Sequence, residues 1–180
     1  MKYLKTYEET NSLDLIEATK NNNLKKVKKL INAGANIDLQ DKNENTALIW
    51  ASFHNNIEIS KELIKAGANI DLQNRWRNTA LILASLFNYI EIVKELIKAG
   101  ANLNLQDNDG YTALIGASFK NYIEITKELI KAGADWNLKD SDNKDFLDYL
   151  KPKIKEQIIS EFPEEYNLYL AKKDAEKYNL

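Results

Sequence analysis

The apolar positions between residues 38 and 136 recur with a period of 33 residues. Three blocks, 38–70, 71–103 and 104–136, align without gaps, and 20 of their 33 columns hold the same residue in all three. A fixed period of this length is typical of proteins built from one structural unit that is copied along the chain. We therefore expect a repeat protein, in which stacked neighbours bury the apolar faces that no single unit can bury alone.

Each block predicts two short helices. A threonine precedes an apolar run with helical spacing, where its hydroxyl can accept hydrogen bonds from free N–H groups of the first turn. The first helix is expected over ranges such as Ala47–His54, and an asparagine, which tolerates the left-handed conformation, ends it. The second helix begins near Ile57 and ends at a glycine suited to the position after a helix. These residues are the threonines Thr46, Thr79 and Thr112, the asparagines Asn55, Asn88 and Asn121, and the glycines Gly67, Gly100 and Gly133.

Degenerate copies flank the three full repeats. Residues 12–37 read as an N-terminal capping repeat and residues 137–150 as a partial C-terminal one, so the array is expected over residues 1–150. Residues 151–180 depart from the repeat and predict a helical tail, in which Pro152 and Pro163 each suit the first position of a helix. This tail is expected to cap the stack, to dock on a partner, or to fray.

The unit resembles the ankyrin repeat. Its period of 33, T-A-L-x-x-A-S start, IEI-x-KELI second helix and AGA-x loop are similar to that family over about residues 12–150. The resemblance implies an all-α solenoid of helix-turn-helix pairs with extended loop or β-turn connections. The family's TPLH stands here as TALI, and its loop-tip glycine survives only at Gly110, with Glu44 and Arg77 at the other two tips. Either these tips keep a positive φ, at a cost on the order of 1 kcal/mol each, or the turn is altered.

Columns that differ between the repeats indicate a binding surface. Leu48, Ala51 and Ser52 recur in each full repeat as the core side of the first helix, whereas its other face and the loop tips vary. The resemblance implies that loop tips and first helices line one concave surface. The varying columns supply tryptophan, tyrosine and arginine, the types enriched at binding hot spots. The candidates for partner binding are Trp50, Phe53, His54, Arg75, Trp76, Arg77, Leu86, Phe87, Tyr111, Phe119 and Lys120.

Some of these candidates have an alternative interpretation as core. Phe53, Leu86 and Phe119 could pack sideways between adjacent first helices, and Trp50 and Leu83 could be partly buried in the same way. Trp76, in contrast, lies in a loop tip between two arginines, where burial is difficult to arrange. His54 is the single histidine, and such a residue is far more often ordinary surface than a ligand or a base.

Composition narrows the partner class. The chain has 180 residues, 44% of them hydrophobic and 29% charged, and a net charge of −2, which gives no attraction to nucleic acid or to anionic membranes. With no cysteine, disulfides and thiolate zinc sites are absent. No apolar stretch suggests a signal peptide in Met1–Asn11, and none approaches the roughly 20 residues that span a bilayer. We expect a cytoplasmic protein, with secretion as an effector left open.

No motif for catalysis, a metal or a cofactor is apparent. The lone His54 without a serine and aspartate context makes a triad improbable. The repeat glycines are spaced as helix stops and form no phosphate loop. The acidic run from Asp140 fails as a calcium loop, because Asp145 replaces its glycine and Lys151 its bidentate glutamate. We expect neither an enzyme nor a cofactor.

The sequence therefore predicts a non-catalytic module that binds another protein through its concave face and loop tips. The chain is expected to be a monomer, and self-association through the apolar face is one alternative. Nucleic-acid binding through Lys42, Arg75, Arg77 and Lys120 is a second, which the acidic balance opposes. A bacterial effector or immunity protein that acts by binding is a third.

Overall fold

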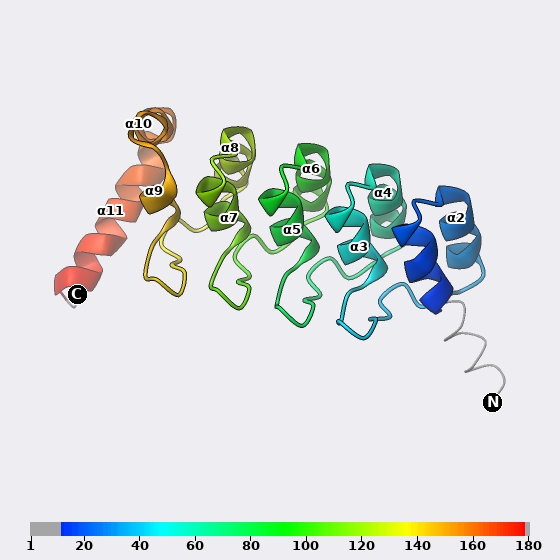
Figure 1. Ribbon diagram of the computed structural model, residues 1–180. Coiled ribbons are helices and arrows are strands. Elements are labelled where there is room, and N and C mark those ends of the chain that lie inside the picture. The colour runs from blue at the N-terminus through cyan, green and yellow to red at the C-terminus, as the bar shows by residue number, and fades with distance from the viewer. Residues whose placement is uncertain (1–11, 179–180) are drawn as a thin grey trace.

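The computed structural model describes residues 12–178, which form a single row of stacked helix pairs (Figure 1). Residues 1–11, where no signal peptide is expected, lie outside the described part. The pairs are a helix over residues 12–20 with α2 (Leu24–Asn32), α3 (Ala47–Phe53) with α4 (Ile57–Lys65), α5 (Ala80–Leu86) with α6 (Ile90–Lys98), and α7 (Ala113–Phe119) with α8 (Ile123–Lys131). The row ends with α9 (Phe146–Tyr149), α10 (Pro152–Glu161) and α11 (Pro163–Tyr178). The helical solenoid expected from the repeat is confirmed.

The first helix of each full repeat is capped as its sequence predicts. The hydroxyls of Thr46, Thr79 and Thr112 accept hydrogen bonds from backbone N–H groups three residues on, at 3.2, 3.1 and 3.1 Å. The helix expected over Ala47–His54 ends one residue earlier, at Phe53. The reason is local, because Asn55 takes a φ of 57° and turns the chain toward α4.

The loop tips keep a left-handed backbone residue whether or not it is glycine. Glu44 and Arg77 have φ values of 61° and 60°, and Gly110 has 81°. Both tips therefore keep a positive φ, and the alternative of an altered turn is wrong. At Gly110 a side chain would also collide with the next loop, since a Cβ there would lie 2.8 Å from the Cα of Asp140.

The core lies between the two helix layers. α3 packs against α5, α5 against α7, and α7 against α9, while α4, α6 and α8 form the second layer. Leu48, Ala51 and Ser52 are at most 1% exposed, as predicted from the face of the first helix that recurs in each full repeat. Ile59 and Leu63 of α4 are fully buried against it.

A ladder of glutamines joins the loops of successive repeats. The side-chain amide of Gln40 donates to the carbonyl of Gln73 at 3.0 Å, Gln73 to Gln106 at 3.0 Å, and Gln106 to Lys139 at 2.8 Å. Each of the three amides also donates to the tip of its own loop, at 2.6 to 2.7 Å. Because the tips are tied both internally and to their neighbours, they form one continuous strip.

The C-terminal helices pack on the end of the row. Ile158 of α10 and Tyr169 of α11 are 0% and 5% exposed. Tyr169 donates a hydrogen bond of 2.7 Å to Asp145, the residue that caps the N-terminus of α9 and is 1% exposed. Pro152 and Pro163 begin α10 and α11, as expected of prolines at a helix start.

Candidate functional site

Exposed aromatic side chains come from the first helices of the repeats, from the residue that follows α5, and from one loop tip. Trp76 is 48% exposed, Phe87 43%, Phe119 42% and Phe53 39%, although such side chains are ordinarily buried. The sideways-core alternative therefore does not hold for Phe53 and Phe119. The half-buried Leu86 and Trp50 and the buried Leu83 do contact the core region, as that alternative expected of them.

Most of these rings belong to two clusters. Phe53 meets Trp50 edge to face at 5.9 Å and Phe87 of the next repeat at 5.2 Å, measured between ring centroids. A second cluster joins Phe119 to Tyr111 at 5.7 Å and to Tyr149 at 5.3 Å. Such geometries are favourable beyond the area they bury, so the rings hold one another in place while one side stays open.

These rings line two adjoining grooves. The first, which we name the tryptophan groove, has a volume of about 230 Å³ and is walled by Trp50, Phe53, Trp76 and Leu83 over a floor of asparagines. The second, the phenylalanine groove, has a volume of about 380 Å³ and lies one repeat further on. Its apolar walls are Phe53, Leu83, Leu86, Phe87, Tyr111 and Phe119, and its polar groups are Asn78, Asp107, Asp109 and Lys120.

Of the remaining sequence candidates, Lys120 lines the phenylalanine groove, whereas Arg75, Arg77 and His54 line neither groove. The guanidinium of Arg75 stands 5.7 Å from the Trp76 ring and donates to Asn43 at 3.2 Å. Arg77 is exposed and lines neither groove. His54 is also exposed, stacks on Trp50 at 5.4 Å between centroids, and has its Nδ1 3.1 Å from the carbonyl oxygen of Trp50. The ammonium of Lys120 lies 5.2 Å from the centre of Phe119.

Polar residues at the base of each loop shape the electrostatics. Asp41 accepts hydrogen bonds from the indole of Trp50 at 2.9 Å and from the backbone of Asn43 and Asn45. Burial tends to raise the pKa of Asp41, but these bonds and the nearby Lys20 hold it below its ordinary value of 3.8. Burial raises the pKa of Asp107, in contrast, against the opposing effect of its backbone hydrogen bonds.

Comparison of the repeats did not select three of the polar residues that line the grooves. Asn78, Asp107 and Asp109 line the phenylalanine groove, yet asparagine and aspartate are ordinary turn residues and gave no reason to be chosen. The available signal was the column that reads Asp41, Asn74, Asp107 and Asp140 at the 33-residue period. The asparagine side chain can donate a hydrogen bond and the aspartate carboxylate cannot, so a change between them in this column alters which partners the buried side chain can have.

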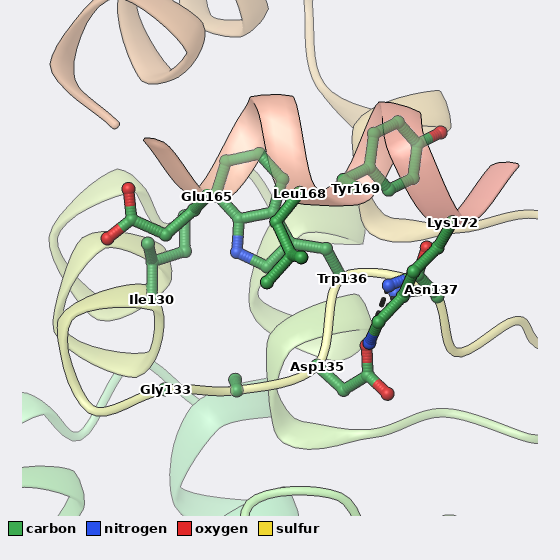
Figure 2. A pocket seen from close by; sticks show the side chains of 10 residues that line it. Ile130, Gly133, Asp135, Trp136, Asn137, Glu165, Leu168, Tyr169 and Lys172 are labelled. Atoms are coloured by element: carbon green, nitrogen blue, oxygen red, sulfur yellow. Dashed lines mark hydrogen bonds and ion pairs between the residues drawn. The ribbon is translucent and has the colours of Figure 1, made fainter. Parts of the chain in front are cut away.

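A further hollow of about 320 Å³ lies between α11 and the chain that follows α8 (Figure 2). Ile130, Trp136 and Leu168 supply its apolar walls, and Lys172 pairs with Asp135 at 3.6 Å at its margin. Trp136 is 4% exposed, and its indole N–H has no hydrogen-bond partner. Such a donor is commonly served by a buried water.

Within residues 12–178, no three histidine, cysteine, aspartate or glutamate side chains are arranged to hold a metal ion. The same range holds no helix that is both long and apolar enough to cross a membrane. The grooves thus offer apolar walls and a few hydrogen-bonding groups, which is the chemistry of recognition.

Comparison with known proteins identifies the fold family. A family model described as ankyrin repeats (3 copies) matches residues 15–107 and 55–140. The search of curated proteins finds no match. Ankyrin repeats are generally protein–protein interaction modules, and the family is typically non-catalytic. With its family's repeat matched across residues 15–140, the chain belongs to the ankyrin repeat family.

Proposed function

We propose that this chain is a non-catalytic module that binds a partner protein through its concave face and loop tips. One observation carries the proposal: Phe53, Trp76, Phe87 and Phe119 are 39–48% exposed on one face, around two apolar grooves. Contiguous apolar surface of this kind marks interaction sites in soluble proteins. The partner-binding residues proposed are the eleven sequence candidates, with those that wall the grooves at the centre.

The rigidity of the face supports tight binding. Loop tips tied by Gln40, Gln73 and Gln106 lose little conformational freedom when a partner arrives, so less binding energy is spent on ordering them. Trp50 is held by the hydrogen bond that its indole donates to Asp41, and the loop tip that carries Trp76 is held by the bond from its backbone N–H to the Asn74 side chain at 3.0 Å. Aromatic anchors held in this way are typical of interface hot spots.

The test removes the two open anchors together. In the variant Trp76→Ala/Phe87→Ala, the loss of partly exposed ring contacts should cost no more than about 1–2 kcal/mol of stability in total. Helical circular dichroism should stay unchanged, while capture of the partner from a lysate of the source cells is abolished. The matched control, Lys65→Ala/Lys98→Ala, changes two exposed side chains at the ends of α4 and α6 and should leave capture intact.

Two outcomes would overturn the proposal. Capture that is equal in both variants would place the partner surface elsewhere, and collapse of the helical signal in Trp76→Ala/Phe87→Ala would mean that these rings are core.

Light scattering at rising concentration separates the proposed monomer from self-association, since only the latter raises the mass. Within this proposal the chain acts in the cytoplasm and needs neither a cofactor, a membrane nor nucleic acid.

A further inference from the structure

We propose that the phenylalanine groove receives an arginine side chain of the partner, whose guanidinium donates hydrogen bonds to Asp107. This inference rests on the proposed function and specifies the chemistry of one of its contacts. Asp107 lies in the groove wall and is 8% exposed, and within residues 12–178 its carboxylate is hydrogen-bonded through Oδ1 alone.

Equivalent positions in the other repeats each obtain a side-chain partner. Asp41 accepts from the indole of Trp50 through Oδ2 at 2.9 Å, and Asp140 accepts from the hydroxyl of Tyr149 through Oδ2. Asn74 needs no such donor, since its own Nδ2 donates to Asn45 at 2.8 Å. Oδ2 of Asp107 has neither arrangement and is left for a donor from outside.

Gly116 is the reason for this difference. It occupies the column of Trp50 and Tyr149, the residues that supply the donors in the first full and the last repeat. Glycine supplies none, and the space beside it is taken by Leu86, whose Cδ2 would lie 3.0 Å from a Cβ built on Gly116. The third full repeat thus keeps the acceptor while lacking the side chain that would satisfy it.

Asn78 shows the same break in the pairing between repeats. In the preceding repeat, Asn45 Oδ1 accepts from the amide of Asn74, 29 residues on. The residue 29 positions after Asn78 is Asp107, which as a carboxylate cannot donate, and Asn78 Oδ1 is buried without a partner among the described residues. Asp107 Oδ2 is not buried in this way, so it is the acceptor that a ligand in the groove can reach.

Charge and shape favour arginine. The charged groups lining the groove are Asp107, Asp109 and Lys120, one cation against two carboxylates. A planar guanidinium has five donors in a fixed fork that matches a carboxylate, and it stacks on aromatic faces. The surrounding walls of Phe87, Phe119 and Leu86 suit its apolar stem.

The test uses small probes in place of the partner. N-acetyl-arginine methylamide is titrated into the ¹⁵N-labelled full chain, and the amide signals of Asp109 and Tyr111, which both donate to Asp107, are followed by NMR. We expect saturable shifts with the arginine probe, and binding at least about tenfold weaker for the neutral isostere N-acetyl-citrulline methylamide. The lysine analogue should bind more weakly than arginine but more tightly than citrulline.

Asp107→Asn is the decisive variant, because Asn74 shows that asparagine supports the same turn. Asn74 Oδ1 accepts from the N–H groups of Trp76 and Asn78 just as Asp107 Oδ1 accepts from Asp109 and Tyr111. Asp107→Asn should weaken arginine-probe binding about tenfold or more. Asp142→Asn, the control at the equivalent exposed position of the next loop and outside the groove, should change it by no more than about twofold.

Equal binding of the arginine and citrulline probes, or equal binding to wild type and Asp107→Asn, would overturn the inference. An absence of saturable shifts with every probe would do the same. None of these results touches the wider proposal, which depends on whether Trp76→Ala/Phe87→Ala loses capture of the partner. If capture survives that variant while the arginine probe still binds at Asp107, the proposed surface fails and the cation site stands.

Discussion

Asp107→Asn should make the protein more stable even as it removes the arginine contact. In wild type, Asn78 Oδ1 is a buried acceptor without a donor, and burial raises the pKa of Asp107, so the ionised carboxylate is disfavoured in the fold. An asparagine at 107 can donate to Asn78 as Asn74 donates to Asn45 at 2.8 Å. A newly satisfied buried hydrogen bond contributes about 1 kcal/mol, and the turn's two backbone bonds are retained.

Urea unfolding followed by circular dichroism should therefore show a gain of about 1 kcal/mol at pH 7, and thermal melting a rise of about 2–4 °C. The gain should shrink in acid. A carboxyl group whose pKa is raised in the folded state stabilises the protein as the pH falls through that pKa, because protonation removes the buried charge. The protonated acid can also donate to Asn78, so wild type approaches the variant at about pH 4 and below.

Asp142→Asn is again the control, with an expected change within about 0.5 kcal/mol because its side chain is exposed. A loss of stability in Asp107→Asn at neutral pH would refute the reasoning. It would mean that the Asn78 amide is turned so that its nitrogen already serves Asp107, and that the variant removes a charge-assisted bond. The same result would remove the open acceptor at Asp107 on which the arginine contact depends.

Three further variants test other parts of the structure. Trp50→Phe removes the indole donor of Asp41, so the pKa of that carboxyl, measured by ¹³C NMR, should rise; an unchanged value would mean that Lys20 and the backbone bonds suffice. Gly110→Ala should cost more than about 1 kcal/mol in urea unfolding, since it adds a collision with the next loop to the strain of a positive φ, and a smaller loss would show that the loops can separate. Tyr169→Phe leaves Asp145 without its hydroxyl donor and should lower stability by about 1–2 kcal/mol, with faster hydrogen exchange in α11 than in α4. Equal exchange changes in both helices would mean that α11 does not open separately.

Repetition made most of the fold predictable. Three aligned copies separate what stacking requires from what varies, and the capping threonines, left-handed asparagines and terminal glycines each have one local role. The same comparison separates Phe53 and Phe119 from the shared face that forms the core.

What the sequence left undetermined depends on contacts between repeats. Whether Phe53 is exposed or lies sideways between helices is decided by the spacing of neighbouring first helices, which a repeat pattern does not give. The deficit at Asp107 arises from a residue 29 positions earlier, Asn78, and another 9 positions later, Gly116. Turn composition carries no sign of either relation. The aspartate and asparagine column at the 33-residue period marks the position of Asp107, but the open oxygen of its carboxylate is seen only in three dimensions.

The glutamine ladder has a mechanical consequence for a chain with two neighbouring grooves. Bending between two repeats stretches or compresses the link at that junction, Gln40 to Gln73 or Gln73 to Gln106. The two grooves are lined from these same junctions, so each link resists the widening of one groove. Gln73 takes part in both links, which makes it the residue whose loss would loosen both grooves at once.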